Sequence, residues 1–297
     1  KDDRILPYIL ELGNSESPIH RYYYLEALKY IEDDRVTVHL NKLLHDPSPA
    51  IRSEAIEVVG KMNLKEKEAI VLNMAKKDSN YEVRKYGILY AKDKKLSYRR
   101  DIFQSGIFDK HPEVREVTVD AFEQFKNSSY SSFVSKAMEK ENLSYLRLKM
   151  IDSLLAMKNH GGGLGLIAAL KFDRTEEVRV KAAYATAKLN ARIAIPSLIQ
   201  SLSKESSVPV KIEVVKTLGI MKEKSAIPAL LTSLKNSNED LSLRKATLSS
   251  LDQIDDPRVM PVIFDLIEDE TTDFQKNMKE FLREMLYRYH GGKFKKA

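Results

Sequence analysis

Apolar and polar positions recur along this chain with a period of 31 to 33 residues. Small residues occur three and six places after a marker residue, and larger apolar residues seven places after it, which is the spacing of one buried helical face. A fixed period of this length indicates stacked units that contact only their neighbours. The marker residues are Arg21, Arg52, Arg84, Arg115, Arg147, Arg179, Lys211, Arg244 and Gln275.

Each unit is expected to hold two helices joined by a polar turn. Leu198 and Leu202 recur at i and i+4 behind Pro196, and the same arrangement returns 32 residues later. Proline is tolerated in a first helical turn because its missing N–H has no partner within the helix. A second helix with the marker residue follows. The pattern predicts an all-α, right-handed solenoid of about nine antiparallel helix pairs, with the second helices lining the concave side.

The period places the units within one continuous domain, residues 1–289. The unit boundaries lie at about 4–34, 35–65, 66–97, 98–128, 129–160, 161–192, 193–224, 225–257 and 258–289. Residues 290–297 form a basic tail that we expect to be disordered. The sequence opens at Lys1 rather than at a methionine, so removal of an N-terminal signal stays open, as does a cytoplasmic or extracytoplasmic location. We expect a monomer.

An acid precedes most marker residues by six places, in the turn between the two helices. Carboxylates there can accept bonds from helix N–H groups and pair with arginines of their own and adjacent units. We therefore expect a structural ladder along the array. Its pairs are Asp46–Arg52, Asp78–Arg84, Asp109–Arg115, Glu141–Arg147, Asp173–Arg179 and Glu205–Lys211, with Asn238–Arg244 and Asp269–Gln275 at the same offset.

These features together resemble HEAT repeats. The turn acid, the Val-Arg pair, the small residue three places on and the short period are most similar to the compact class of phycobilin-lyase-like HEAT proteins. The resemblance runs from Leu6 to about Tyr289, with departures at Leu146-Arg147 and Phe274-Gln275. It implies an α-solenoid that binds macromolecules, and it implies no single activity.

Candidates for catalytic or cofactor chemistry are weak. The chain has no cysteine, and no apolar run is long enough to span a bilayer. Gly163 to Ala168 match a dinucleotide fingerprint in letters, but a helix precedes them, so we interpret the glycines as a flexible turn. His39 and His45 lie on different sides of a first helix, which excludes a shared metal ion. We expect no enzyme activity, no cofactor and no metal.

One segment carries most of the excess positive charge. Lys61 to Arg100 contain twelve basic and five acidic residues, a net charge of +7, whereas the whole chain carries +6. Tyrosines alternate with the cations, and such a surface can neutralise phosphates and stack on bases. Core packing of the tyrosines is the structural alternative. The candidate basic patch is Lys85, Lys92, Lys94, Lys95, Arg99 and Arg100.

The residue after the marker is expected to face the groove. It is Leu148, Val180 and Ile212 in three consecutive units, and Tyr184 lies one turn beyond Val180. A contiguous apolar strip on a surface indicates a partner site. Tyr22 occupies the same position in the first unit and could reach the groove, although a capping role is the alternative.

The sequence therefore predicts a non-enzymatic scaffold that binds a protein or peptide through its groove. The apolar strip would anchor the partner, and Lys85, Lys92 and Lys94 would steer it electrostatically. Two alternatives stay open: a nucleic-acid-binding repeat protein that uses the basic face at 61–100, and a lyase-like or chaperone-like helper that holds a client. The identity of the partner does not follow from the residues.

Overall fold

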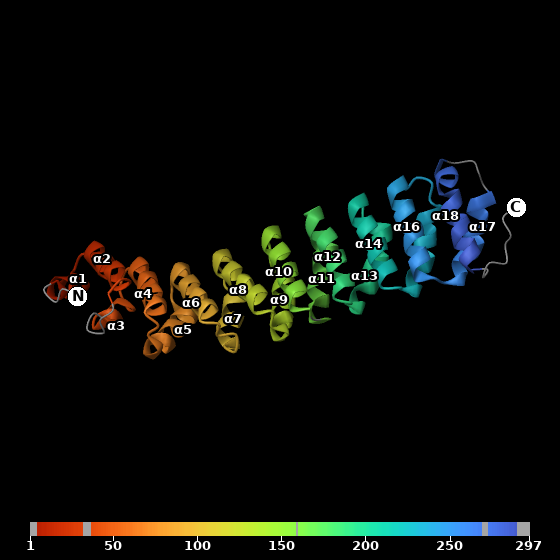
Figure 1. Cartoon of the computed structure of the whole chain (residues 1–297). Coiled ribbons are helices and arrows are strands. Elements are labelled where there is room, and N and C mark those ends of the chain that lie inside the picture. Colours follow the sequence, from red (N-terminus) through yellow and green to blue (C-terminus); the bar gives the residue numbers. More distant parts are fainter. Residues whose placement is uncertain (1–4, 32–36, 159, 269–272, 290–297) are drawn as a thin grey trace. The chain divides into compact units, whose positions relative to one another are not determined.

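The computed structural model describes residues 5–31, 37–158, 160–268 and 273–289 (Figure 1). Helices connected by short turns make up these residues, and no strand occurs among them. The helices alternate along the chain between the first and the second member of a pair. The prediction of an all-α solenoid of helix pairs is confirmed. The predicted basic tail at 290–297 lies outside the described residues.

The first helices of the pairs are α1 (Leu6–Asn14), α3 (Leu40–Leu43), α5 (Glu68–Lys77), α7 (Arg100–Ile107), α9 (Ser131–Met138), α11 (Gly163–Phe172), α13 (Ile195–Lys204), α15 (Ile227–Lys235) and α17 (Met260–Glu268). The second helices are α2 (Pro18–Leu28), α4 (Pro49–Lys61), α6 (Tyr81–Asp93), α8 (Pro112–Phe125), α10 (Ser144–Met157), α12 (Glu176–Lys188), α14 (Val208–Ile220), α16 (Leu241–Ile254) and α18 (Asp273–Tyr289). Short 3₁₀ turns lead into several first helices: η2 (Lys65–Lys67), η3 (Ser128–Tyr130), η4 (His160–Gly162), η5 (Arg192–Ala194), η6 (Lys224–Ala226) and η7 (Pro257–Val259).

The chain forms two compact units, residues 1–137 and residues 138–297. In the first unit the second helices pack in sequence order, α2 on α4, α4 on α6 and α6 on α8. In the second unit α10, α12, α14, α16 and α18 follow the same rule. The boundary between the units falls inside the repeat predicted at 129–160, and one continuous domain over the whole chain stays a prediction.

The core of each unit lies between the two layers of helices. On α12, the residues three, four, six and seven places after Arg179 are all buried: Ala182, Ala183, Ala185 and Thr186. Large side chains fill the equivalent places elsewhere, among them Phe122 of α8, whose ring stacks on that of Tyr130 at 4.5 Å. Small residues allow neighbouring second helices to approach, and large ones fill the remaining volume.

Among the described residues, seven of the second helices are followed by a residue in the left-handed backbone conformation, which the periodicity of the sequence does not reveal. Residues one or two places beyond these helices have positive φ angles of 47° to 56°, and none of them is glycine. They are Asn63, Lys95, Lys126, Lys158, Asn190, Lys222 and Asp255. The left-handed conformation redirects the chain toward the next first helix, and it is unfavourable for a residue with a Cβ atom unless that residue is Asn or Asp.

The Lys126→Gly variant is expected to raise the free energy of unfolding by about 0.5–1 kcal/mol, because glycine adopts the left-handed conformation without a steric cost. Lys126 ends α8 at φ 51° and is exposed, so no packing contact opposes the change. Urea denaturation measures the effect. The Lys126→Ala variant removes the same charge and keeps the Cβ atom, so an equal gain there would contradict the explanation.

The interpretation of the glycines as an inter-repeat turn holds only in part: Gly161 and Gly162 lie in the 3₁₀ turn η4 between α10 and α11, but the following glycines do not. Gly163 begins α11 and Gly165 lies within it. A Cβ atom on Gly163 would come within 2.4 Å of Ile193 Cγ2 in the following repeat. The glycine therefore leaves room for the Ile193 side chain to pack between the two repeats. No strand precedes it among the described residues, so the letters of the fingerprint have no dinucleotide-binding context.

Candidate partner-binding surface

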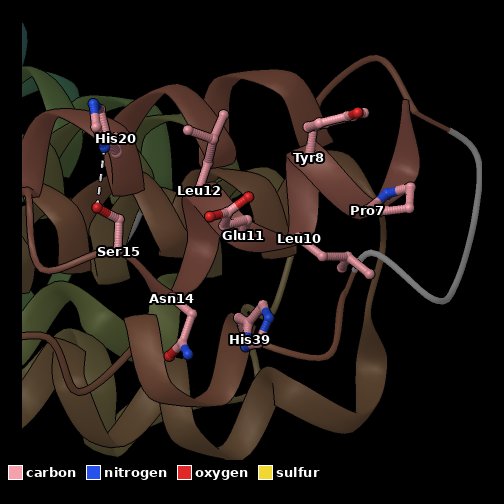
Figure 2. A pocket seen from close by; sticks show the side chains of 9 residues that line it. All are labelled: Pro7, Tyr8, Leu10, Glu11, Leu12, Asn14, Ser15, His20 and His39. Atoms are coloured by element: carbon pink, nitrogen blue, oxygen red, sulfur yellow. Dashed lines mark hydrogen bonds between the residues drawn. The ribbon is translucent and has the colours of Figure 1, made fainter. Parts of the chain in front are cut away.

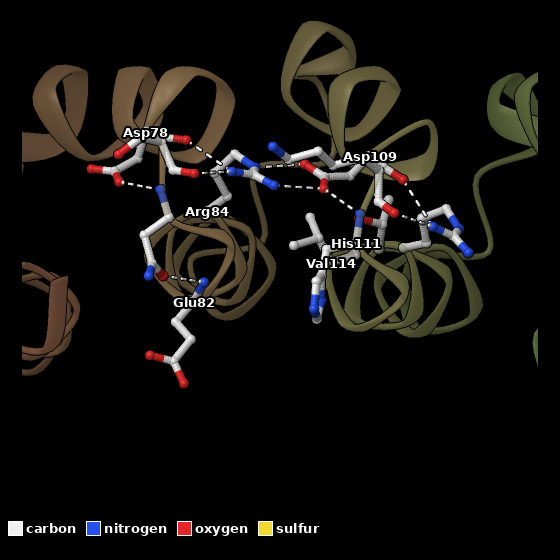
Figure 3. Close-up of polar contacts among 11 residues, drawn as sticks. Asp78, Glu82, Arg84, Asp109, His111 and Val114 are labelled. Carbon is white, nitrogen blue, oxygen red and sulfur yellow. Dashed lines mark hydrogen bonds and ion pairs between the residues drawn. The ribbon is translucent and has the colours of Figure 1, made fainter.

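A ladder of arginines and acids fixes the turns from which the second helices project (Figure 3). Each turn acid accepts a bond from the backbone N–H two residues later, as Asp78 does from Asn80 at 2.9 Å and Asp109 from His111 at 2.9 Å. A carboxylate in this position satisfies a free N–H group at the start of the second helix. It therefore defines where that helix begins.

Several ladder arginines join two successive turns, as Arg84 shows. Arg84 Nη1 donates to the main-chain oxygen of Asp78 in its own repeat at 2.8 Å. Its Nε and Nη2 donate to the two carboxylate oxygens of Asp109 in the next repeat, at 2.6 and 2.8 Å. Arg52 binds Asp46 and Asp78 in the same manner. The side-chain pairs thus connect neighbouring repeats, and the bond within a repeat goes to the backbone.

The same bidentate pairing joins Arg21 to Asp46 and Arg179 to Glu205. Arg147 forms an ion pair with Asp173. Arg115 donates to the main-chain oxygens of Asp109 and Lys110.

The ladder changes chemistry toward the C-terminal end of the described residues. Lys211 pairs with Glu239 at 2.8 Å, one residue after the Asn238 that occupies the acid position in the sequence. Arg244 donates from Nε to the main-chain oxygen of Leu234 at 2.9 Å, and burial lowers its pKa. The side chain of Gln275 lies outside the described residues.

Burial and hydrogen bonding act against each other at the ladder carboxylates. Burial of Asp109 favours its neutral form, but the bonds from Arg84 and from the His111 N–H outweigh this, and the pKa of Asp109 is lowered. The pKa of Glu205 is lowered for the same reasons, with Arg179 as its cation. Asp109 and Glu205 therefore stay ionised and keep their charge-assisted bonds to Arg84 and Arg179.

The main candidate surface is the side of the second helices that lies opposite their buried residues. We call this surface the B-face. It comprises the residues two places before and one, two, five, eight and nine places after each marker, which share one side of a helix. Because successive second helices contact one another, their B-face residues form a continuous surface within each unit. The B-faces of the two units differ in their charged and apolar residues.

The B-face of the second unit carries the predicted apolar strip. Leu148 of α10, Val180 of α12 and Ile212 of α14 are each half-buried, and Tyr184 is 42% exposed. Tyr145 and Ile220 are also exposed on this face, and sequence reasoning did not select them. Their positions in the repeat could have identified them, because Tyr145 lies two places before the marker Arg147 and Ile220 lies nine places after the marker Lys211.

Charged groups border the apolar strip without dominating it. Lys181 of α12 pairs with Asp152 of α10 at 2.5 Å, and Lys188 Nζ lies 5.3 Å from the centre of the Tyr184 ring. Burial raises the pKa of Glu213, whose carboxyl lies on α14. An apolar centre with a polar rim is the usual composition of a protein-binding surface.

The first unit places Tyr22 on its own B-face, away from the apolar strip. Tyr22 is 41% exposed and lies beside Tyr23, with ring centres 6.1 Å apart in an edge-to-face arrangement. Nearby Glu26 raises the pKa of the Tyr22 hydroxyl. Tyr24, the third tyrosine of the run, is buried in the core. Only the first two therefore contribute to an exposed surface.

The six residues of the predicted basic patch do not gather on one face. Lys85 lies on the B-face and pairs with Glu113 at 2.7 Å, and Lys92 is half-buried on the same helix. Lys94 instead donates to the Gly60 main-chain oxygen and to Asn63 Oδ1, each at 2.8 Å, and so binds the C-terminal end of α4. The remaining cations lie in the turn that follows α6 or at the start of α7: Lys95, Arg99 and Arg100.

Arg99 and Arg100 also have local contacts. Arg99 pairs with Asp101 at 3.3 Å. Arg100 lies over the Phe133 ring at 5.1 Å and donates to the Ser129 main-chain oxygen. Several of the six cations therefore stabilise turns between repeats.

A hollow of about 830 Å³ lies beside α1 (Figure 2). His20 Nδ1 is 3.0 Å from Ser15 Oγ, and Asn14 accepts a bond from Lys42 at 2.6 Å. His20 and His39 lie at separate places on its wall. Its lining residues are Pro7, Tyr8, Leu10, Glu11, Leu12, Asn14, Ser15, His20 and His39. This arrangement brings no set of reactive groups together.

The described residues contain neither a metal-binding cluster nor a membrane-spanning helix. No group of three or more His, Cys, Asp or Glu side chains there is placed to hold a metal ion. None of the helices described is both long and apolar enough to cross a membrane.

The family follows from a direct comparison with known sequences. The model of HEAT repeats matches residues 6–91 and 164–242, together more than half of the chain. This chain belongs to the HEAT-repeat family. The HEAT repeats that the turn acids and the Val-Arg pairs predicted are thereby confirmed.

A curated relative is similar over part of the chain. The bilin biosynthesis protein PecE of Nostoc sp. (strain PCC 7120) is 31% identical over 108 residues, which are 34% of this chain. The match spans 42% of the length of PecE, less than half of that protein.

The solved structure of Kap95p shows the same fold. Kap95p, solved in a complex with RanGDP, aligns with 95% of this chain and 45% of its own, at a TM-score of 0.55 and 11% identity. The complex of CpcE and CpcF of phycocyanin lyase from Nostoc sp. PCC7120 covers 94% of each chain at 12% identity. The TM-score for this complex is 0.29.

Proposed function

We propose that this protein is a non-enzymatic scaffold that binds a protein or peptide on the B-face of its second unit. The observation that carries the proposal is the apolar row of Leu148, Val180 and Ile212 with the half-exposed Tyr184 beside it. Apolar side chains that remain accessible at one position of three successive helices suit an anchor for a partner. The bordering ion pair of Lys181 and Asp152 supplies a polar rim.

Selection of binding peptides from a random displayed library tests this function. We expect enriched peptides with apolar anchors, and we expect their affinity to fall at least tenfold, about 1.4 kcal/mol, in the Val180→Ser/Ile212→Ser variant. The matched control is Leu164→Ser, which changes an exposed leucine on α11 and should leave binding unchanged. Absence of enrichment, or equal binding by the Val180→Ser/Ile212→Ser variant, would contradict the proposal.

A second candidate function rests on the similarity to PecE. In this role the chain is a lyase-like helper that holds a protein client while a bilin is attached, and the apolar strip contacts the client. Mixing the purified protein with phycocyanobilin and recording the bilin absorbance tests the role. A spectral shift that saturates with increasing protein concentration supports the helper function. An unchanged spectrum excludes a helper that itself binds the bilin.

A further inference from the structure

The B-face of the first unit is acidic, although the sequence segment that contributes much of it is basic. On the described faces of α2, α4, α6 and α8 the carboxylates outnumber the lysines nine to four, a net charge of −5. The carboxylates are Glu26, Glu54, Glu57, Glu82, Asp93, Glu113, Glu116, Asp120 and Glu123, and the lysines are Lys29, Lys61, Lys85 and Lys92. The other cations of residues 61–100 lie on first helices, in turns or in the ladder.

The same face of the second unit has a different character. Four acids and five bases lie at the equivalent places of α10, α12, α14 and α16, a net charge of +1. The acids are Asp152, Glu177, Glu213 and Asp252, and the bases are Lys149, Lys181, Lys188, Lys216 and Lys245. The acidic surface is therefore a property of the first unit and not of the repeat itself.

Three carboxylates of the first unit crowd around a single lysine. Lys29 Nζ lies 2.9 Å from Glu26, forms an ion pair with Glu54 and lies 3.7 Å from Glu57. Its side chain is only 10% exposed, so one cation is enclosed by three carboxylates. Burial together with Glu57 and Glu26 raises the pKa of Glu54 against the effect of Lys29. Burial is the larger cause, and the repulsion that Glu57 and Glu26 add to it would be relieved by a further cation.

Aromatic side chains lie among these acids. Tyr22 and Tyr23 of α2 are exposed on the B-face, and so is Tyr30, which lies two residues beyond the end of α2. Lys61 Nζ of α4 lies 4.4 Å from the centre of the Tyr30 ring, which shows that this surface already accommodates an ammonium group over an aromatic face. Acids and accessible rings together match the chemistry of lysine and arginine side chains.

We propose that the acidic B-face of the first unit binds a lysine- and arginine-rich extended segment of a partner protein. Charge complementarity selects this occupant: a surface of −5 with exposed tyrosines attracts cations and repels nucleic acid. Four helices packed about 9 Å apart span roughly 27 Å, the length of about eight extended residues. The surface lies wholly within the first unit, so the proposal is independent of the apolar strip.

Fluorescence anisotropy with labelled ten-residue peptides tests the proposal on the full chain. A peptide of alternating lysine and serine is expected to bind at 50 mM salt, to weaken at least tenfold at 300 mM, and to exceed the glutamine–serine and glutamate–serine peptides in affinity. The Glu57→Gln/Glu123→Gln variant should bind at least threefold more weakly. The Glu11→Gln/Glu66→Gln variant loses the same charge away from the B-face and should stay within twofold of the unsubstituted protein.

Three results would overturn the proposal: equal weakening in the two variants, equal binding of the glutamine–serine peptide, or binding of a DNA duplex in place of the lysine–serine peptide. Zero-length carbodiimide cross-linking, read by mass spectrometry, provides a measurement that requires no variant. Cross-links from the peptide lysines to B-face carboxylates such as Glu57 and Asp120 support the proposal. Cross-links confined to carboxylates of first helices refute it. The Val180→Ser/Ile212→Ser variant should bind this peptide normally, which separates the acidic surface from the apolar strip.

Discussion

The Arg84→Ala variant is expected to lose about 3 kcal/mol of unfolding free energy. The side chains of Arg84 and Asp109 are 6% and 8% exposed, so the substitution leaves a buried carboxylate without its cation. It also removes the bond from Arg84 to the Asp78 main-chain oxygen. Because repeats are stabilised by their nearest neighbours, the loss should weaken the contact between α6 and α8 most.

Hydrogen exchange together with urea denaturation measures this loss, since exchange reports where a repeat array opens. Arg84→Lys keeps a charge but cannot reproduce the bidentate contact, so an intermediate loss is expected. Arg283, which pairs with Glu280 on an exposed surface of α18, supplies the matched control. If Arg283→Ala destabilises the protein as much as Arg84→Ala, the bridging role assigned to the ladder is wrong.

The Gly87→Ala variant is expected to lower the free energy of unfolding by about 2 kcal/mol, although alanine is the better helix former. A Cβ atom on Gly87 would lie 2.6 Å from Ala75 Cβ and 2.7 Å from Ala75 Cα. Part of that contact is with backbone, so α5 and α6 would have to separate. The small residue here therefore sets how closely the two helices of a pair approach.

A second helical glycine provides the control for this prediction. A Cβ atom on Gly60 would lie 3.5 Å from the Tyr90 ring, an ordinary contact distance. Gly60→Ala is thus expected to stabilise the protein by about 0.5–1 kcal/mol through helix propensity alone. Thermal unfolding of the two variants makes the comparison. A stabilised Gly87→Ala variant would show that the packing of α5 on α6 is looser than the distances indicate.

Much of the architecture was predictable from the sequence, because helical periodicity reports which side of a helix is buried. The positions three, four, six and seven places after Arg179 form one such side, and all four are buried. The HEAT repeats and the all-α solenoid followed from that periodicity and from the turn acids. The interpretation of Gly163 as part of a flexible turn was wrong because a glycine letter does not distinguish a turn from close packing.

The candidate surfaces were less predictable, because they depend on which side chains of different repeats become neighbours. The sequence placed Leu148, Val180 and Ile212 at one helical position, and the structure leaves each half-buried. It presented residues 61–100 as one basic segment, but the fold separates their charges between layers. Lys94 binds the end of α4, whereas Lys85 and Lys92 lie on a B-face that is acidic overall.

By itself the sequence determined the repeat, the helix pairs and the residue types available at each position of a helix. Only the tertiary structure decided that Arg84 joins its own turn to the carboxylate of Asp109, 25 residues later, and that Lys126 adopts a left-handed conformation. It also decided that the acids of four helices share one surface. The physical reason is that local periodicity fixes the direction of a side chain about its own helix axis, whereas contacts between repeats depend on how the helices pack.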